Sequence, residues 1–437
     1  MPRNLFWIAA SCILALLALL PAFSSGASPT VKEKVIYSFT GGTDGAYPLS
    51  DLTLDAEGNL YGTASNGGIF NCGFNNAFGC GTVFELKRSQ GVWKLEVLYS
   101  FTGGSDGGGL QAGVIFDKAG NLYGTAGALY GGPGTVFKLS PNSHGGWTQS
   151  TIYAFNCSGS DGCVPQGDLV FDSQGNLFGT TSSGAGGNCG MFNNGCGAVF
   201  ELTPHANGSW TETTVHSFAG APNDGAGPVA GVVFDAAGNI YGTTQYGGSG
   251  SCGRFSALPP GCGTSYKLTF SGGTWTETLL YNIVRGDGFG IYPPGELFFD
   301  NPNHLLGVTL KGGDGYGTVF ELNYTQERGW RETQPHVFYS NPDGELPMGR
   351  LVADTKGELL GVTQLGGGGS GTVFELKHLQ NGWKERIVHN FAGPPDGAYP
   401  YAGLVSDSQG HLYGTTQGGG AGTGCDGPCG TVYEVTP

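Results

Sequence analysis

Residues 117–125 read DKAGNLYGT, and the pattern returns as DAEGNLYGT at residues 55–63 and as DSQGHLYGT at residues 407–415. The aspartate that opens each copy can cap a turn, and the glycine three residues later tolerates the left-handed backbone that a tight turn requires. Related turns occur seven times along the chain, so we interpret their aspartates as structural rather than catalytic. These residues are Asp55, Asp117, Asp172, Asp235, Asp300, Asp354 and Asp407.

A longer unit surrounds each turn and also recurs seven times. The units begin near residues 37, 99, 153, 216, 281, 336 and 389. Within a unit, four segments have the composition of short β-strands. Examples are AGVVFD at residues 230–235, IYGTT at 240–244, GTVFEL at 317–322 and WKLEVLYSF at 93–101. Four-stranded units repeated at this spacing predict the blades of a β-propeller.

The two ends of the repeat region complement each other. The seventh unit ends with GTVYEV at residues 430–435 and lacks a fourth strand, whereas residues 31–39 match that strand, with Val31 at the tryptophan position. A ring closed in this way hides its sheet edges. We therefore predict an all-β fold, a single seven-bladed β-propeller of residues 28–437. Each blade has four strands, and the strand contributed by the N-terminus is outermost in the last blade.

The repeat resembles that of the GloVer tandem-repeat family of secreted bacterial proteins, over roughly residues 31–437. The motif at residues 55–63, 117–125 and 407–415 carries this resemblance, together with GTVFEL at residues 81–86. Repeats five and six depart from the motif, because LGV at residues 306–308 and at 360–362 lacks the tyrosine. The resemblance implies a propeller-like fold and export from the cell, and it implies no particular reaction.

The first 27 residues have the features of a signal peptide. Arg3 provides a basic start, residues 5–20 are apolar, and Ser25-Gly26-Ala27 is a small-residue cleavage site. The alternative is an uncleaved membrane anchor, but the apolar run is short for a membrane span. We expect a secreted protein, extracellular or periplasmic, with no membrane span after cleavage.

Ten cysteines follow the predicted signal peptide, and each has a close neighbour in the sequence. The pairs are Cys72/Cys80, Cys157/Cys163, Cys189/Cys196, Cys252/Cys262 and Cys425/Cys429. An even number of cysteines in an exported chain indicates disulfides. Every pair lies inside one predicted loop, so local pairing is the simplest connectivity. Zinc ligation is the weaker interpretation, because only the last pair approaches the spacing of zinc ligands and no second pair follows it.

The formal net charge is −15, which disfavours binding to nucleic acids or anionic lipids. We expect a monomer. The alternating strands place two classes of loop on one face, and this face holds the long insertions and the cysteine pairs. Loops on a rigid scaffold commonly bind ligands, and disulfides lower the cost of ordering them. The alternative is that glycine-rich loops need disulfides simply to persist outside the cell.

An Asp-Gly pair recurs in the first of these loop classes. The aspartates are Asp44, Asp106, Asp161, Asp224, Asp287, Asp343 and Asp396. Asp-Gly is an ordinary turn signal, and we favour that interpretation. The alternative is a Ca²⁺ site, since Ca²⁺ takes six to eight oxygen ligands. We otherwise expect no cofactor and no metal.

We identify no catalytic residue from the sequence. The string at residues 103–107 matches a nucleophile elbow, but no helix follows it, as that elbow requires. His216, His336 and His389 stand where other repeats have tyrosine, and we interpret them as structural. Candidate binding residues are tyrosines of the loop face and charged residues that break the repeat consensus: Tyr292, Tyr316, Tyr399, Tyr401, Arg254, Arg285, Lys311 and Asp314.

Three functions fit these observations. The first is binding of an extracellular polymer, such as a carbohydrate, through the disulfide-bearing face. The second is polysaccharide lyase or glycoside hydrolase activity on the same face. The third is a structural role in the cell envelope. A pocket on this face that gathers Arg285, Lys311 and several carboxylates would favour the second, whereas a flat face would favour the others.

Overall fold

We describe a computed structural model of the chain, for residues 32–68, 72, 79–127, 132–187, 189, 195–252, 260–284, 291–312, 315–425 and 427–436. The predicted signal peptide lies outside these residues. The described elements are all β-strands. Within the described part of the chain, no helix is long and apolar enough to cross a membrane.

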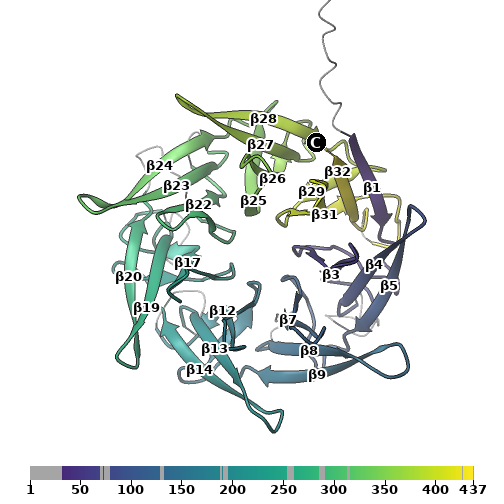
Figure 1. Cartoon of the computed structure of the whole chain (residues 1–437), viewed down its shortest axis with the longest axis horizontal. Helices are drawn as coiled ribbons and strands as arrows, with labels where there is room; N and C mark the ends of the chain where they lie inside the picture. The colour runs from purple at the N-terminus through teal and green to yellow at the C-terminus, as the bar shows by residue number, and fades with distance from the viewer. Residues whose placement is uncertain are drawn as a thin grey trace, which may run out of the picture. The chain divides into compact units, whose positions relative to one another are not determined.

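The strands form seven antiparallel blades arranged around a central axis (Figure 1). Blade 1 contains β2 (Thr53–Leu54), β3 (Leu60–Ala64), β4 (Thr82–Ser89) and β5 (Val92–Ser100). Blade 2 contains β6 (Ile115–Phe116), β7 (Leu122–Ala126), β8 (Thr135–Pro141) and β9 (Trp147–Ala154). Blade 3 contains β10 (Gly162–Pro165) and β11 (Val170–Phe171), then β12 (Leu177–Gly184), β13 (Ala198–Pro204) and β14 (Trp210–Ser217).

The remaining blades follow the same plan. Blade 4 contains β16 (Val233–Phe234), β17 (Ile240–Thr244), β19 (Thr264–Ser271) and β20 (Thr274–Asn282), beside the short pair β15 (Gly225–Ala226) and β18 (Tyr246–Gly247). Blade 5 contains β21 (Phe298–Asn301), β22 (His304–Thr309), β23 (Thr318–Thr325) and β24 (Gly329–Val337). Blade 6 contains β25 (Gly344–Ala353), β26 (Leu359–Gly366), β27 (Thr372–Leu379) and β28 (Gly382–Asn390).

Blade 7 joins the two ends of the repeat region. It contains β29 (Gly397–Pro400) and β30 (Val405–Ser406), then β31 (Leu412–Gly419), β32 (Thr431–Thr436) and, outermost, β1 (Lys32–Ser38). β1 pairs antiparallel with β32, from Lys32 opposite Thr436 to Ser38 opposite Thr431. The predicted seven-bladed propeller, closed by an N-terminal outer strand, is confirmed.

The recurring turn motif explains the regularity of the blades. In blade 1, Asp55 accepts hydrogen bonds from the backbone of Glu57 and Asn59, at 3.0 and 2.8 Å, and from the Asn59 amide at 2.8 Å. The Tyr61 hydroxyl also donates to Asp55, at 3.2 Å. Glycine follows the tyrosine because a Cβ at Gly62 would lie 2.8 Å from Leu52 and from the Phe84 ring. The turn aspartates are therefore structural, as predicted.

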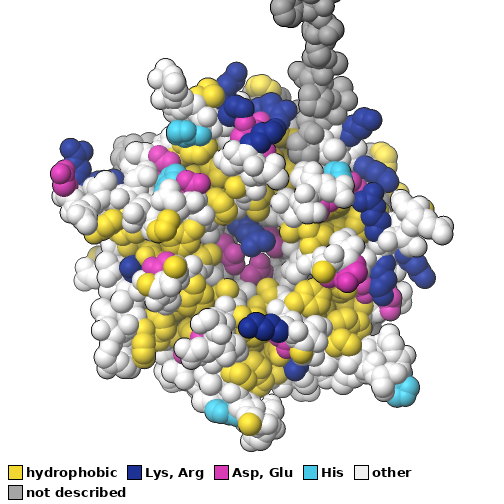
Figure 2. Space-filling model, viewed as in Figure 1, with side chains coloured by type: hydrophobic (Ala, Val, Ile, Leu, Met, Phe, Trp, Pro, Cys, Tyr) yellow, Lys and Arg dark blue, Asp and Glu magenta, His cyan; other side chains and the backbone are white. Residues whose placement is uncertain are grey.

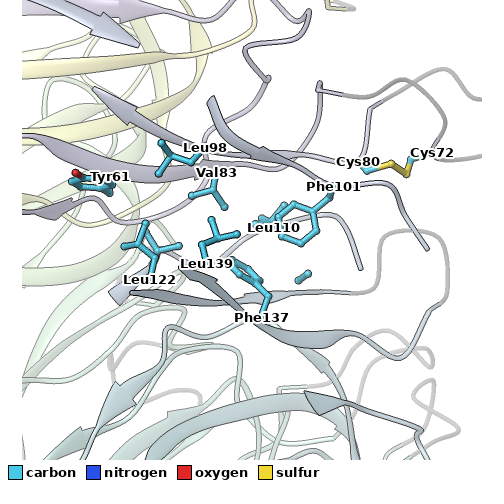
Figure 3. Close-up of a cluster of buried hydrophobic side chains, with 12 residues drawn as sticks. Tyr61, Cys72, Cys80, Val83, Leu98, Phe101, Leu110, Leu122, Phe137 and Leu139 are labelled. Atoms are coloured by element: carbon cyan, nitrogen blue, oxygen red, sulfur yellow. A yellow bond between two sulfur atoms is a disulfide. The ribbon is translucent and has the colours of Figure 1, made fainter. Parts of the chain in front are cut away.

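Apolar side chains pack between neighbouring blades rather than within one sheet. Between blades 1 and 2, Val83, Phe101, Leu110, Phe137 and Leu139 are fully buried in one cluster, close to the disulfide between Cys72 and Cys80 (Figure 3). Burying a large apolar side chain contributes about 1.5–3 kcal/mol. Each blade is therefore held mainly by its neighbours, and the inner strands are fixed around the axis.

Candidate functional site

Each blade contributes one equivalent residue to the central channel. This residue lies two positions before the short inner segment that pairs with the second strand of the blade, as Asp51 precedes β2 in blade 1. We call it the channel position. Glycine occupies this position in blades 2, 4 and 7, as Gly113, Gly231 and Gly403. Charged residues occupy it in the other four blades: Asp51, Asp168, Glu296 and Arg350. We call these four residues the channel cluster.

Hydrogen bonds to neighbouring blades hold two of the acids. Asp51 accepts from the backbone N–H of Gly403 and Asp168 from that of Gly113, both at 2.6 Å. Nε of Arg350 lies 3.0 Å from Oδ2 of Asp51. The backbone hydrogen bonds fix the two carboxylates against the channel wall, and the positive charge of Arg350 partly offsets their negative charge.

The alternating glycines make room for the charged side chains. A Cβ at Gly231 would lie 1.9 Å from Oε1 of Glu296, and a Cβ at Gly403 would lie 2.8 Å from Cγ of Arg350. Any larger residue would displace these groups. In Figure 2, acidic and basic side chains gather at the centre of the ring, surrounded by hydrophobic ones.

Burial and mutual repulsion separate the titrations of two carboxyls in the channel cluster. Burial, and then the charge of Asp51, raise the pKa of Asp168 to about 6, although Arg350 and the Gly113 N–H oppose this shift. Burial, and then the charge of Asp168, raise the pKa of Glu296 to about 8. Both carboxyls therefore keep their protons to higher pH than ordinary carboxyls do, and Glu296 keeps its proton to higher pH than Asp168.

The channel cluster separates two cavities. One has a volume of about 280 Å³, and its lining includes Leu49, Gln111, Gln166 and Tyr401. The other has a volume of about 330 Å³ and a largely apolar lining that includes Phe171. All four charged residues of the cluster contribute to both cavities. We call the first the upper cavity.

The upper cavity opens toward the disulfide-bearing face, where the Asp-Gly loops and the disulfides meet. A Cβ at Gly41, in one Asp-Gly loop, would lie 2.6 Å from Sγ of Cys425, and a Cβ at Gly103 would lie 2.2 Å from Sγ of Cys72. Leu49 follows the Asp-Gly loop of its blade and lines the upper cavity. The cavity therefore lies on the face that the sequence favours as the working face.

Polar amides contribute to the lining of the upper cavity. Gln111, Gln166 and Gln245 line it, and Nε2 of Gln166 donates to Oε1 of Gln111 at 2.8 Å. Tyr401 adds an exposed aromatic ring. Amides both donate and accept hydrogen bonds, and carboxylates accept them. The arrangement thus suits a small ligand rich in hydroxyl groups.

The structure describes five of the eight predicted binding residues, and Tyr401 is the one of these five that lines the upper cavity. Lys311 is exposed and pairs through its backbone with Ile291. Tyr399 is exposed outside the cavity lining. Tyr292 and Tyr316 lie outside this lining and contact neighbouring blades. Three candidates lie outside the described residues: Arg254, Arg285 and Asp314.

The two supporting tyrosines take part in joints between blades. The backbone N–H of Tyr292 donates to the Cys262 carbonyl at 3.0 Å, and its hydroxyl donates to the Cys252 carbonyl at 3.3 Å. The carbonyl of Tyr316 accepts from the Leu346 N–H at 2.8 Å, and its ring packs on a buried cluster. The structure therefore favours a packing role for both over a role in binding.

The five local cysteine pairs are bonded in the structure. At each blade junction, a residue in the left-handed conformation donates its N–H to a carbonyl of the preceding blade. In four junctions that carbonyl belongs to the second cysteine of a pair: Cys80, Cys196, Cys262 and Cys429. These four disulfides therefore stabilise the loop that accepts the hydrogen bond at a joint between blades. This favours a structural role for the disulfides over a role in ligand binding.

The fifth disulfide, between Cys157 and Cys163, corrects one expectation about the cysteines. We expected both members of each pair to lie in one loop, and this is wrong for Cys163, which belongs to the inner strand β10. The physical reason is the length of β12, which extends to Gly184 and pairs Ser183 with Cys163. This disulfide therefore ties the Asp-Gly loop to the start of an inner strand, and Cys163 is buried there.

The Asp-Gly aspartates that the structure describes are engaged within their own loops. Asp44 accepts from the backbone N–H and hydroxyl of Thr40, at 2.8 and 2.5 Å, and from the Tyr37 hydroxyl at 2.9 Å. Asp106 has equivalent bonds with Thr102 and Tyr99. These contacts favour the turn interpretation over a shared Ca²⁺ site. Asp287 lies outside the described residues.

The sequence carries a signal for the channel cluster. The inner-strand motif has glycine at the channel position in three repeats, and the other four carry charged residues. A charge that breaks a repeat consensus marks a position that the blade itself does not require. Breaks in the consensus of the fifth repeat select Arg285, Lys311 and Asp314, whereas the breaks at the glycine position of the inner strands select the channel cluster.

The family model for the Gloeobacter/Verrucomicrobia repeat matches residues 25–193 and 255–437. The chain belongs to this repeat family. This match confirms the family resemblance that the repeat motifs of the sequence indicate. A search of curated proteins found no match.

Several solved structures are similar to this member of the Gloeobacter/Verrucomicrobia repeat family at low identity. An oxidoreductase described as a glucose dehydrogenase, from Thermus thermophilus, is 14% identical with a TM-score of 0.43, covering 93% of this chain and 100% of its own. A gluconolactonase from Xanthomonas campestris is 14% identical with a TM-score of 0.37, covering 72% and 82%. The PQQ-bound aldose sugar dehydrogenase of Streptomyces coelicolor is 13% identical with a TM-score of 0.42, covering 94% and 100%. Likeness at this level carries no information about activity.

Proposed function

We propose that this propeller is a secreted carbohydrate-binding protein that holds the end of an extracellular polysaccharide in the upper cavity. The observation that supports this most strongly is the ring of three glutamines and Tyr401 above the channel cluster. Sugar hydroxyls need both donors and acceptors, which amides and carboxylates provide, and a sugar ring can pack on an aromatic face.

The size of the cavity narrows the proposal to a chain end. Ligand pockets usually measure about 300–1,000 Å³, and the upper cavity, at about 280 Å³, lies just below this range. A cavity of this size suits one sugar ring better than several, and the channel cluster closes its floor. A polymer would therefore enter by its terminus, with the rest of the chain lying over the disulfide-bearing face.

Retention on insoluble cellulose, xylan and chitin tests this proposal. Tyr401→Ala should weaken retention about tenfold, the loss typical of truncating one central aromatic contact. Tyr399→Ala is the matched control, because the two tyrosines are exposed to a similar extent, 37% and 42%, and only Tyr401 lines the cavity. Equal retention of both variants would refute the placement of the site. If the wild type binds none of the polymers, polysaccharide binding is refuted and the structural role in the cell envelope becomes the favoured function.

A second candidate function is hydrolysis of a glycosidic bond, favoured by the separated pKa values of Asp168 and Glu296. Paired carboxyls with different protonation states are the requirement for acid–base cleavage of glycosides. Glu296 would protonate the leaving oxygen, and Asp168 would take a proton from the attacking water. Release of reducing sugar that Glu296→Gln abolishes, without loss of retention, would establish hydrolysis. Retention without release would leave binding alone.

A further inference from the structure

A second set of polar side chains recurs at the junctions between blades, away from the channel cluster. Each set combines the last tyrosine or histidine of one outer strand, the aspartate of the following Asp-Gly loop, and the residue two positions after the tryptophan of the next outer strand. At the junction of blades 3 and 4 these residues are His216, Asp224 and Glu277. At the junction of blades 6 and 7 they are His389, Asp396 and Glu33.

The groups at the first junction converge on one point. Nε2 of His216 lies 3.5 Å from Oδ2 of Asp224 and 3.7 Å from Oε2 of Glu277. One ligand atom from each residue lies within 4.8 Å of the others. The side chains are largely buried, with exposed fractions of 20%, 12% and 14%. Three potential ligand atoms therefore face one another in a confined space.

The second junction repeats this arrangement. Nε2 of His389 lies 3.4 Å from Oδ2 of Asp396, and Glu33 of β1 completes the set within the same 4.8 Å limit. Its histidine and aspartate have exposed fractions of 21% and 20%. Because the two sets occupy equivalent positions in different blades, the convergence is a property of the repeat.

Both sets contain buried atoms that lack hydrogen bonds. Among the described residues, Nε2 of His216 and Oε1 of Glu277 form no hydrogen bond, and the nearest carboxylate oxygen to that nitrogen is Oδ2 of Asp224 at 3.5 Å. Within the same part of the chain, Nε2 of His389 and Oε1 of Glu33 also form no hydrogen bond. Leaving a buried polar atom unsatisfied costs about 1–3 kcal/mol. Oε1 of Glu385, the equivalent residue at the junction of blades 5 and 6, is also unsatisfied, so this cost recurs with the glutamate. A bound ion would offset the cost where the histidine, aspartate and glutamate converge.

At other junctions, the residue at the tyrosine or histidine position forms a hydrogen bond directly with the aspartate of the Asp-Gly loop. The Tyr37 and Tyr99 hydroxyls donate directly to the Asp-Gly aspartates, at 2.9 and 3.1 Å. At the junction of blades 5 and 6, Nε2 of His336 is already bonded to Asp343, at 3.2 and 3.3 Å. Glu385 faces His336 at that junction. At the two junctions of the proposal, by contrast, Nε2 of the histidine lies 3.4–3.5 Å from the aspartate without a hydrogen bond, and the three ligand groups converge within 4.8 Å.

The chemistry of these two sets fits a metal ion. A tetrahedral ion with bonds of about 2.0–2.2 Å to nitrogen and oxygen separates its ligand atoms by about 3.3–3.6 Å. The measured separations are 3.4, 3.5 and 3.7 Å. An imidazole with two carboxylates suits a borderline transition metal, whereas Ca²⁺ requires six to eight oxygens.

We propose that the junction of blades 3 and 4 and the junction of blades 6 and 7 each bind one divalent transition-metal ion of the Zn²⁺ class. Three protein ligands hold each ion, and water completes its coordination. Because the histidine and the glutamate or aspartate come from successive blades, each ion joins two neighbouring outer strands. The second ion also ties β1 to the blade that precedes it, next to the point where the ring closes.

The test uses the full chain without an affinity tag, cleared of metal by a chelator that is then removed, with its disulfides intact. Zn²⁺ binding is measured by calorimetry and by elemental analysis after equilibrium dialysis. We expect two equivalents to bind the wild type. His216→Tyr and His389→Tyr should each lose one equivalent, and the double variant both.

The repeat itself supplies the variants and their control. Tyrosine stands at the histidine position in other blades, so these substitutions introduce a residue that the fold already accommodates. Gln149 stands at the glutamate position, so Glu277→Gln has the same precedent and should also remove one equivalent. His336→Tyr should leave both equivalents in place.

Co²⁺ provides a second readout, since four-coordinate Co²⁺ absorbs strongly in the visible range and its spectrum should weaken by about half in each single variant. Absence of saturable Zn²⁺ binding in the folded wild type would overturn the proposal. An unchanged stoichiometry in the double variant would also overturn it, because the ions would then be bound by exposed histidines such as His144 and His205.

Discussion

The two faces of the propeller are built from the same seven repeats, yet they differ in how strictly the repeat is kept. On the turn face, each blade carries nearly the same aspartate-capped turn. On the disulfide-bearing face, loop lengths vary, four junctions have a cysteine acceptor and three have none, and the channel position holds glycine or a charge. Residues common to all blades, together with the four disulfides at the junctions, thus hold the ring together, and the charged departures from the consensus at the channel position mark a candidate site.

The largest effect is expected from breaking a turn on the uniform face. Asp117 accepts bonds from the Ala119 and Asn121 backbone, from the Asn121 amide and from the Tyr123 hydroxyl, at 2.7–3.1 Å. Asp117→Ala should lower the free energy of unfolding by about 3 kcal/mol, because several charge-assisted bonds are lost together. Urea denaturation measures this loss. Lys118→Ala, on the same turn, is the control and should change little.

A smaller effect is expected on the variable face when a disulfide is removed. Cys72 and Cys80 are eight residues apart, and replacing both with alanine should cost about 2.5 kcal/mol through the greater entropy of the unfolded chain. The folded variant should retain wild-type affinity for polysaccharide. Loss of retention in a variant of unchanged stability would show that this loop binds the ligand directly.

A further effect is expected in how the free energy of unfolding depends on pH. The native pKa values of Asp168 and Glu296, about 6 and about 8, exceed the ordinary values of 3.8 and 4.5. Between the ordinary and the native pKa of each group, the native state holds more protons than the unfolded state. These two groups therefore make the free energy of unfolding fall as pH rises toward about 8.

Glu296→Gln sharpens this prediction, because it removes the group with the larger shift. Its free energy of unfolding should decline less steeply than that of the wild type between about pH 5 and pH 8. Urea denaturation at several pH values gives both slopes. Identical slopes would show that Glu296 titrates normally in the folded protein.

The fold followed from the sequence because repeated motifs report local structure directly. The turn aspartates, the glycine that meets the phenylalanine ring, and the match between residues 31–39 and a missing strand all depend on short segments. The channel cluster depends on the meeting of single residues from four blades, and it was visible only as substitutions at one glycine position. The contacts of Tyr292 and Tyr316 with neighbouring blades could not be predicted from the sequence. They form at the joints between blades and involve backbone groups, whose partners the sequence does not reveal.

The central claim is that the charged residues at the channel position form the floor of the binding site, that binding requires them, and that the fold does not. A variant with glycine at all four positions, as in blades 2, 4 and 7, tests it most directly: Asp51→Gly, Asp168→Gly, Glu296→Gly and Arg350→Gly. Binding of this variant and the wild type would be compared on cellulose, xylan and chitin, with circular dichroism to verify the fold. The account predicts a folded propeller that no longer binds, and a folded variant with wild-type retention would contradict it.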